Sequence, residues 1–445
     1  MTNSTSTGRL SDTAVIPLQT LNPAESLDDL AWLDEAIGDA RVVAIGESAH
    51  YNREFFQLRH RLLRYLVERH GFSAYAMETG FIESRLVDNW IRGGAEPLGQ
   101  VMAQGVTSLM GLWTQMRDHL EWMREHNDNA GRSIGFYGID LPGSMVSLLP
   151  GLDAVLAYLA QADPDLCPDP GIRETASLYA AASAFSAPEA LASYGKLAPE
   201  RRDALTANLA DLAERMRGRR LDYVRRTTAE AYEHALQALR ITITLDSMIR
   251  EMTRGDQQVM IFNRDAAIAD TVEWILRSED RIVLAAHNGH VQRWPLTLPG
   301  RPPATPMGMH LADRLGTDYL VIGTTSGIGK TLNTGPDFYT GTLFTEMEPP
   351  QPGSLDALMA ASHDGPFATD LRRLTPADTT SVRAASQQRA GIGAVYSDQS
   401  PLDAYDIVIH LPHVTPAEPD RDALAYASRE VQEPFAQWQP GTAPE

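Results

Sequence analysis

The segment VVAIGESAHYNREFF, residues 42 to 56, places ionisable side chains directly after an apolar run. Glu47, His50, Arg53 and Glu54 fall within eight positions of one another. Near pH 7 a neutral imidazole can accept a proton from water, and a carboxylate bonded to its other nitrogen fixes the tautomer. The segment therefore predicts that His50 is a general base, oriented by a carboxylate, at the end of a buried strand.

Three further apolar runs also end at ionisable residues. The run AYAME ends at Glu78, IGFYGID ends at Asp140, and RIVLAAH ends at His287, which His290 follows in the segment HNGH. In open parallel sheets, ligands bind outside the carboxyl ends of the strands. We therefore expect these side chains to surround one pocket, where either Glu47 or Glu78 orients the base.

These residue types suit the hydrolysis of an ester. His287 and His290 are predicted to bind the substrate or to stabilise a tetrahedral intermediate, and Asp140 to lie with them on the substrate side. Arg53 could steady a carboxylate or a developing oxyanion.

The elements that must position these residues alternate between strand and helix. VVAIG (42–46) is a short continuous apolar run, as expected for a strand buried on both faces. Residues 55–71 carry apolar side chains at helical spacing and end at Gly71, a residue suited to a helix C-cap. Further strands are predicted at 318–323 and 405–411. This alternation predicts an α/β fold with a central, mainly parallel sheet flanked by helices.

The middle of the chain follows another pattern, because strand-like runs almost vanish and Ala, Leu, Arg and Glu dominate at helical spacing. We predict a helical insertion there that forms a lid or a small bundle. The predicted divisions are a disordered N-terminal tail (1–25), the first part of the α/β catalytic domain (26–150), the insertion (151–275) and the second part of the catalytic domain (276–445).

The composition narrows the range of partners. The 445 residues carry a formal net charge of −20, from 58 acidic and 38 basic residues, which argues against nucleic acid or an anionic membrane surface. A small-molecule substrate that is neutral or cationic fits this balance. The single cysteine, Cys167, excludes an intramolecular disulfide and a cysteine-based zinc site.

No targeting or membrane segment is expected. The N-terminal stretch MTNSTSTGRLSDT is polar and lacks the apolar region of a secretory signal. No run approaches the roughly 18 apolar residues of a membrane helix. The sequence therefore predicts a cytoplasmic protein.

The segment GESAHYNREFFQLRHRLLRYLVERHGFSAYAMETGF resembles the signature of the erythromycin esterase family. NRDAAIADTVEWIL (263–276), AAHNGHVQR (285–293) and the segments PPQPGSLDALM and FATDLRRL from 349 onward are also similar to that family. The resemblance spans roughly residues 27 to 415.

This resemblance implies hydrolysis of a macrolide lactone by an activated water, without a metal or another cofactor. Carried over by position, it makes His50 the base and adds one substrate-binding candidate, Arg264, to the residues named above. The family commonly has Gly-Thr after the motif histidine, where this chain has Tyr51-Asn52, and Thr where this chain has Ala49. These neighbours are expected to line the pocket beside the base, so they bear on the choice of substrate.

A metal-dependent hydrolase is a competing hypothesis for the same residues. Glu47, His50, Glu78, His287 and His290 offer oxygen and nitrogen ligands that suit zinc or manganese. A metal ion would itself generate the attacking hydroxide. Spacing in the sequence does not decide whether these groups converge on one ion.

The same residues would also suit an enzyme that catalyses a different reaction, or a binding protein that catalyses none. The protein could tailor a polyketide by dehydration, acyl transfer or hydrolysis, or it could sequester a hydrophobic natural product without catalysis.

GTTSGIGKT (323–331) almost matches a phosphate-binding loop, but Thr324 stands where the pattern needs glycine, so a loop bordering the pocket is expected. Ser48 lacks the G-x-S-x-G pattern of a serine nucleophile.

Overall fold

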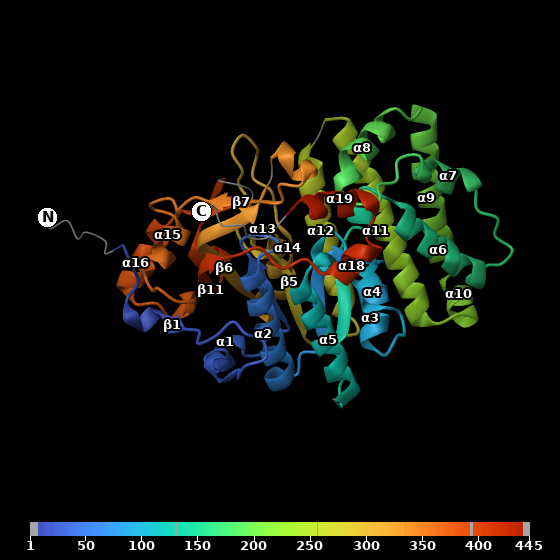
Figure 1. Ribbon diagram of the computed structural model, residues 1–445. Helices are drawn as coiled ribbons and strands as arrows, with labels where there is room; N and C mark the ends of the chain where they lie inside the picture. Colours follow the sequence, from blue (N-terminus) through green and yellow to red (C-terminus); the bar gives the residue numbers. More distant parts are fainter. Residues whose placement is uncertain (1–7, 130, 256, 334, 392–394, 439–445) are drawn as a thin grey trace.

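The computed structural model describes residues 8–129, 131–255, 257–333, 335–391 and 395–438. Its centre is a sheet with the strand order β1-β8-β11-β6-β2-β5-β3-β4, and β7 pairs with the last residues of β6 (Figure 1). The strands of this sheet are β1 (Ile16–Pro17), β2 (Val42–Glu47), β3 (Ala74–Gly80), β4 (Gly135–Asp140), β5 (Ile282–His287), β6 (Tyr319–Leu332), β7 (Phe344–Met347), β8 (Phe367–Asp370) and β11 (Ile407–Val414). A separate pair consists of β9 (Gln387–Arg389) and β10 (Tyr396–Asp398).

The sheet is mainly parallel, as predicted. All neighbours from β11 through β6, β2, β5 and β3 to β4 run parallel, whereas β1, β8 and β7 pair antiparallel. Parallel pairing brings the carboxyl ends of β2, β3, β4 and β5 to one edge of the sheet, where the predicted site residues stand.

The segment GTTSGIGKT forms part of β6, so the prediction of a loop there is wrong. β6 continues to pair with β11 as far as Gly329, and its last residues, from Gly329 to Leu332, pair with β7. A phosphate-binding loop requires a following helix N-terminus, and this segment is a strand.

Helices cover the sheet. The α-helices are α1 (Leu33–Ile37), α2 (Arg53–His70), α3 (Ser84–Ile91), α4 (Leu98–Gly105), α5 (Thr114–Asn129), α6 (Leu149–Ala162), α7 (Pro170–Ser177), α8 (Ala187–Gly195), α9 (Pro199–Gly218), α10 (Arg220–Arg226), α11 (Ala229–Thr253), α12 (Gln257–Ile275), α13 (Asn288–Val291), α14 (Met307–Leu315), α15 (Leu355–Ala360), α16 (Pro376–Ala384), α17 (Pro401–Ala404), α18 (Arg421–Tyr426) and α19 (Arg429–Gln437).

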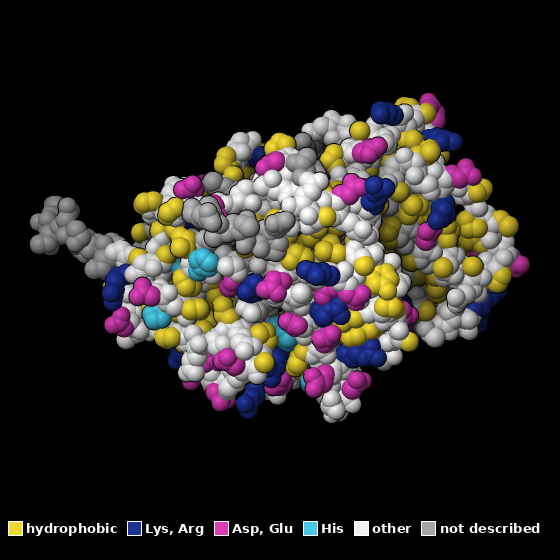
Figure 2. All heavy atoms as spheres, in the orientation of Figure 1, with side chains coloured by type: hydrophobic (Ala, Val, Ile, Leu, Met, Phe, Trp, Pro, Cys, Tyr) yellow, Lys and Arg dark blue, Asp and Glu magenta, His cyan; other side chains and the backbone are white. Residues whose placement is uncertain are grey.

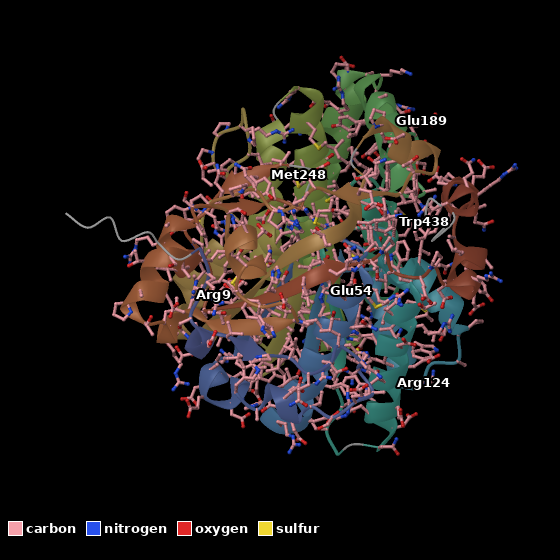
Figure 3. The ribbon with its side chains drawn as sticks, turned by 60° about the vertical axis from the view of Figure 1, so that its left-hand side comes forward. Arg9, Glu54, Arg124, Glu189, Met248 and Trp438 are labelled. Carbon is pink, nitrogen blue, oxygen red and sulfur yellow. The ribbon has the colours of Figure 1, made fainter. Side chains whose placement is uncertain are left out.

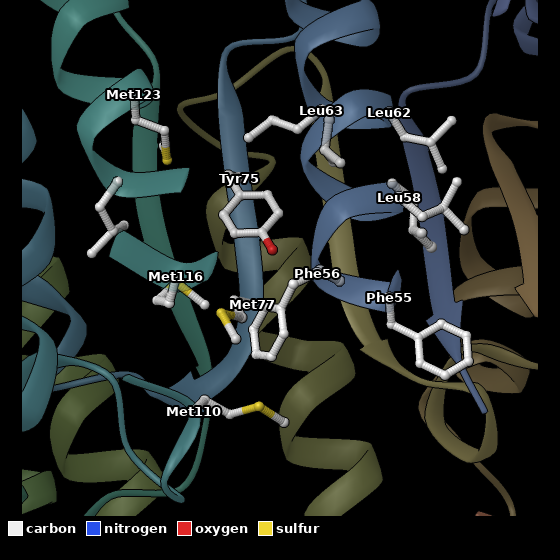
Figure 4. Packing of buried hydrophobic residues seen from close by; sticks show 14 of the residues in the cluster. Phe55, Phe56, Leu58, Leu62, Leu63, Tyr75, Met77, Met110, Met116 and Met123 are labelled. Carbon is white, nitrogen blue, oxygen red and sulfur yellow. The ribbon is translucent and has the colours of Figure 1, made fainter. Parts of the chain in front are cut away.

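α2 shows how the sequence pattern becomes structure. Gly71 ends the helix at a φ of 67°, and its N–H donates to the carbonyl of Val67, which confirms the predicted C-cap. The apolar side chains of α2 pack into the core, and Figure 4 shows Phe56 and Leu63 on the side of the helix that faces Tyr75 of β3. Burial of this face anchors the helix that follows the Glu47–His50 segment.

The described residues between β4 and β5 form helices and turns but no strand, as the composition of this segment predicted. α11 packs against α6, α9 and α12. α6, α9 and α11 share an apolar cluster, and Ala267 and Trp274 of α12 pack against it. α6, α9 and α11 lie on one side of the molecule in Figure 1, whereas α12 lies nearer the centre and contacts β4. The domain boundaries and the lid role stay predictions.

The N-terminal segment differs from the predicted disordered tail. Ile16 of β1 pairs with Ala368 of β8, and Leu10 and Leu18 are buried. The backbone N–H of Leu10 also donates to the hydroxyl of Ser362. The prediction is therefore wrong for residues 8–25, because a few apolar side chains anchor an otherwise polar stretch, and residues 1–7 lie outside the described residues.

The surface carries both charge signs. On the face in Figure 2, Lys and Arg side chains lie among Asp and Glu side chains, although the chain is strongly acidic overall. Within the described residues, no helix has the length and apolar character needed to span a membrane.

Replacing Leu62 by alanine tests the anchoring of α2. Leu62 is fully buried, so Leu62→Ala should lower the free energy of unfolding by about 2–5 kcal/mol through lost burial and a residual cavity. Chemical denaturation measures this change. Leu221→Ala, at an exposed leucine, is the matched control and should change stability by no more than about 0.5 kcal/mol. Equal effects of the two substitutions would contradict the assignment of Leu62 to the core.

Candidate active site

The last residue of β2 and the turn after it form the first half of the site. The Nδ1 atom of His50 donates to Oε1 of Glu47 at 2.5 Å, and Arg59 of α2 donates to Oε2 of the same carboxylate. Glu47 and Arg59 are almost fully buried, whereas the side chain of His50 is 23% exposed. The Nε2 atom of His50 makes no hydrogen bond with any described residue, so this nitrogen is free to meet water or substrate.

These contacts set the protonation of the pair. Burial alone would raise the pKa of Glu47, but the charge of Arg59 and the hydrogen bond from His50 outweigh it and lower this pKa. Burial alone would lower the pKa of His50, but the hydrogen bond to Glu47 and the charges of Glu47 and Glu78 outweigh it and raise this pKa. Glu47 therefore stays ionised, and His50 becomes a stronger base than a free histidine.

The ends of β3, β4 and β5 form the second half of the site. One oxygen of Glu78 accepts from Arg264 at 2.9 Å, and the other accepts from the backbone N–H of His287 at 2.8 Å. Arg264, on α12, also makes a two-pronged contact with Asp140 at 2.9 and 2.6 Å. Helix α12 thus supplies the guanidinium that joins the carboxylates of β3 and β4.

His290 lies between two carboxylates. Its Nδ1 atom donates to Asp265 at 2.7 Å, and its Nε2 atom is 3.3 Å from Glu78 and 3.0 Å from Arg264. Burial and Arg264 disfavour the charged imidazole, but Asp265 and Glu78 raise the pKa of His290 to about 10. Nε2 of His290 can accept a hydrogen bond from Arg264 only when the imidazole is neutral. The carboxylates of Asp265 and Glu78 favour the charged imidazole, in which Nε2–H points to Glu78.

His287 has the opposite electrostatic environment. Burial and the neighbouring His50 lower its pKa to about 3, so its imidazole is neutral. Its Nδ1 atom accepts from the backbone N–H of Gly289 at 3.0 Å, which places the ring proton on Nε2. That Nε2–H is buried and has no partner among the described residues. The rings of His287 and His50 lie 5.1 Å apart, so a donor without a partner stands beside the base.

The charges of this cluster do not quite cancel. The directly connected groups are four carboxylates and three cations, namely Glu47, Glu78, Asp140 and Asp265 against Arg59, Arg264 and protonated His290. With neutral His50 this set carries one excess negative charge. Protonation of His50 removes the excess, which is the electrostatic reason why this imidazole attracts a proton.

The structure brings most of the predicted site residues together but not Arg53. Glu47, His50, Glu78, Asp140, Arg264, His287 and His290 form the connected cluster just described. Arg53 instead pairs with Glu418 at 2.6 Å and lines a separate cavity of about 590 Å³. As the first residue of α2, it reaches the C-terminal segment, and no ion pair among the described residues links it to the cluster.

Two residues that the sequence analysis did not single out complete the site. Arg59 holds Glu47, and its position on the apolar stripe of α2, between Phe55 and Leu62, was the available sign, because a charge on a buried face needs a partner. Asp265 holds His290 and directly follows Arg264 in the sequence.

The metal hypothesis requires these ligands to converge. Among the residues that the structure describes, no group of three or more His, Cys, Asp or Glu side chains is placed to hold a metal ion. Both oxygens of Glu47 and of Glu78 are instead engaged by protein donors.

A carboxylate-bound imidazole at the carboxyl edge of a parallel sheet has the chemistry needed to take a proton from water. Residues 67–414 match the erythromycin esterase family, and the chain belongs to that family. It is therefore a hydrolase of carboxylic esters. The chain is 31% identical over 359 residues to erythromycin esterase type II of Escherichia coli, covering 77% of this chain and 83% of the relative. It is 33% identical over 315 residues to erythromycin esterase type I of the same organism, covering 67% and 73%.

Solved structures share the fold. A protein from Bacillus cereus superposes with a TM-score of 0.77 at 21% identity, covering 92% of this chain and 97% of the other. An erythromycin esterase mutant in its open conformation superposes with a TM-score of 0.72 at 20% identity, covering 89% and 97%. These structures support the α/β architecture with its helical additions.

Gly391 offers a test of the importance of His287. A Cβ atom at this position would lie 2.1 Å from Nε2 of His287 and 2.8 Å from the carbonyl oxygen of Ser48, so Gly391→Ala must shift the packing around that imidazole. We expect kcat to fall by about tenfold or more, because small displacements of catalytic groups are costly. Ester hydrolysis under substrate saturation measures the change.

Gly353→Ala is the matched control for this prediction. Gly353 also has a positive φ, 85°, but a Cβ atom there meets nothing within 4 Å, so the variant carries the backbone strain without the clash. It should lose stability but keep kcat. An equal fall of kcat in both variants would show that strain, rather than His287, governs the rate.

Proposed function

We propose that the protein hydrolyses the lactone of a macrolide, or a similar ester, by means of a water molecule that His50 activates. The observation that carries the proposal is the geometry of His50, whose Nδ1 is bound to ionised Glu47 while Nε2 has no partner among the described residues. Macrolide chemistry comes from the relatives, since the two similar Escherichia coli proteins are named erythromycin esterases.

In the first step, Nε2 of His50 takes a proton from water as the oxygen attacks the ester carbonyl. Glu47 stabilises the imidazolium that forms, and Arg59 keeps Glu47 ionised. The tetrahedral intermediate carries the negative charge on the former carbonyl oxygen.

The groups around His50 suit the second step. The Nε2–H of His287, which is buried beside Gly391 and has no partner among the described residues, is the neutral donor that we assign to the oxyanion. His290 adds positive charge held by Asp265 and Glu78. Arg264 and Asp140 fix that arrangement from α12 and β4, on the substrate side of the cluster. Collapse of the intermediate breaks the ester C–O bond, and the proton on His50 passes to the leaving alkoxide. The products are a carboxylic acid and an alcohol, and one water is consumed.

The remaining assignments stay predictions. They are the cytoplasmic location, the absence of nucleic-acid partners, and the exact ester within the proposed class.

Mass spectrometry of a macrolide panel tests the reaction. Incubation should add the mass of one water to a substrate, whereas dehydration would remove one and an internal acyl shift would leave the mass unchanged. His50→Ala should lower the rate by about 100-fold or more, the usual share of a general base. Parallel incubations with EDTA test for a metal-dependent reaction, since the proposal expects no effect of the chelator. Full activity of His50→Ala would refute the role of His50.

The pH dependence of kcat/KM gives an independent test. Only neutral His50 can accept a proton, and its pKa is raised by Glu47, so activity should rise with pH through an apparent pKa above the ordinary value of about 6.5. This apparent value belongs to the coupled Glu47–His50 pair. A flat profile between about pH 5 and 8 would contradict the assignment.

A further inference from the structure

The residue after the base has a backbone conformation that its side chain disfavours. Tyr51 has a φ of 62°, in the left-handed region that glycine enters freely and a bulky L-residue enters at a cost. Such strain persists only where surrounding contacts hold it, and it is concentrated at functional sites. The contacts of Tyr51 show what holds it here.

The side chain of Tyr51 is fixed at both its ring and its hydroxyl. The hydroxyl donates to the carbonyl of Ser108 at 2.5 Å, and the ring stacks on Trp113 with centroids 5.5 Å apart. The side chain is 7% exposed, and the backbone carbonyl accepts from Ala417 at 2.8 Å. Burial and the nearby carboxylates raise the pKa of Tyr51, so the phenol keeps its proton and remains a donor.

The chain on either side of Tyr51 is also anchored. On the N-terminal side, Glu47 ends β2 and is held by Arg59. On the C-terminal side, Asn52 donates to the carbonyl of Lys330 at 2.7 Å, and Glu54, labelled in Figure 3, accepts from Thr415. The short turn that contains His50 is therefore fixed at both ends.

The left-handed residue turns the chain immediately after His50. This turn leaves the imidazole above Glu47, three residues earlier, at the 2.5 Å contact that defines the base. The rings of His50 and Tyr51 lie 5.6 Å apart. If Tyr51 relaxed to an extended conformation, the backbone that carries the imidazole would shift.

We propose that Tyr51 is a positioning residue for ester hydrolysis: its left-handed backbone, locked by Ser108 and Trp113, holds His50 on the carboxylate of Glu47. This inference rests on the proposed function, because it takes His50 as the base. Tyr51 acts through His50, since its own hydroxyl is engaged by Ser108.

The loop whose Ser108 carbonyl accepts the hydrogen bond from Tyr51 also contacts β3, in the second half of the site. Ser108 and Leu109 also have positive φ values, 55° and 63°, and they line a cavity of about 310 Å³. Thr107 ties the same loop to β3, since its N–H donates to Thr79 at 2.7 Å and its hydroxyl accepts from Gly80 at 2.8 Å. The loop is thus held both by Thr79, the residue after Glu78, and by Tyr51, the residue after His50.

Replacing Tyr51 by alanine and by glycine separates the backbone from the side chain. Both variants lose the ring and the hydroxyl, but only glycine adopts the left-handed conformation without cost. In Tyr51→Ala the turn should relax, lengthen the His50–Glu47 contact and lower kcat by about tenfold relative to Tyr51→Gly, with KM less affected.

The pKa of His50 provides a readout that does not require turnover. NMR titration of histidines labelled at Cε1, with His50 assigned from the spectrum of His50→Gln, measures it directly. The groups that face His50 are Glu47 of β2, Glu78 of β3, His287 at the end of β5, His290 of α13 and the phenol of Tyr51 itself. We expect the raised pKa to be largely kept in Tyr51→Gly and to fall toward about 6.5 in Tyr51→Ala.

Tyr232→Phe is the matched control, because this buried tyrosine of the insertion also donates to a backbone carbonyl, that of Met216 at 3.1 Å. It should leave both kcat and the pKa of His50 unchanged. If the pKa of His50 were identical in wild type, Tyr51→Ala and Tyr51→Gly while the melting temperatures fell, Tyr51 would be only structural and the proposal would be overturned.

The experiment also separates a folding failure of Tyr51→Ala from a failure of the proposed function. If Tyr51→Ala does not fold, Tyr51→Phe keeps the stack on Trp113 and loses only the hydroxyl, and it should give a smaller fall of both kcat and the pKa of His50. An unchanged pKa in that variant overturns the proposal. Failure of the proposed function shows separately, as full activity of His50→Ala, whatever the titration gives.

Discussion

The carboxylate of Glu47 is buried and shared between Arg59 and His50, and the rest of the site depends on this contact. An ionised carboxylate in a buried position is costly unless its charge is compensated and its lone pairs accept hydrogen bonds. Arg59 supplies the charge, so Glu47 stays ionised both before and after the imidazole takes a proton. Without that guanidinium, burial would favour a protonated Glu47, and the base would lose the partner that raises its pKa.

The parallel sheet makes this contact possible, because it brings strand ends that are distant in sequence to one edge. Glu47 of β2 stands opposite His287 of β5 in the strand register, and Glu78 of β3 accepts from the backbone of His287. α12 then adds Arg264, which binds carboxylates from β3 and β4. The helical segment between β4 and β5 therefore contributes Arg264 to the candidate site, and most of its helices also share an apolar cluster.

The site also concentrates backbone strain. Tyr51, Ser108, Leu109, Ser144 and Met145 are the described non-glycine residues with positive φ. They lie in the segments that follow β2, precede α5 and follow β4. Rigid neighbours compensate for such strain, and the benefit is a fixed arrangement of polar groups before the substrate arrives.

Much of this arrangement could be predicted from the sequence, because local patterns carry it. Continuous apolar runs identified β2, β3, β4 and β5. The ionisable residue at the end of each run predicted the candidate site, since parallel strands share one carboxyl edge. The motif segments also identified the family before the match to residues 67–414 showed it.

Only the tertiary structure decided which charges meet. Arg53 and Arg59 both lie on α2 near the base, yet Arg59 faces Glu47 and Arg53 pairs with Glu418, a partner 365 positions away. The pairing of β1 with β8 and the extension of β6 along β11 likewise depend on strands that are distant in the sequence. Sequence patterns record periodicity and residue type, whereas the choice among ion-pair partners depends on distances and burial that exist only once the chain has folded.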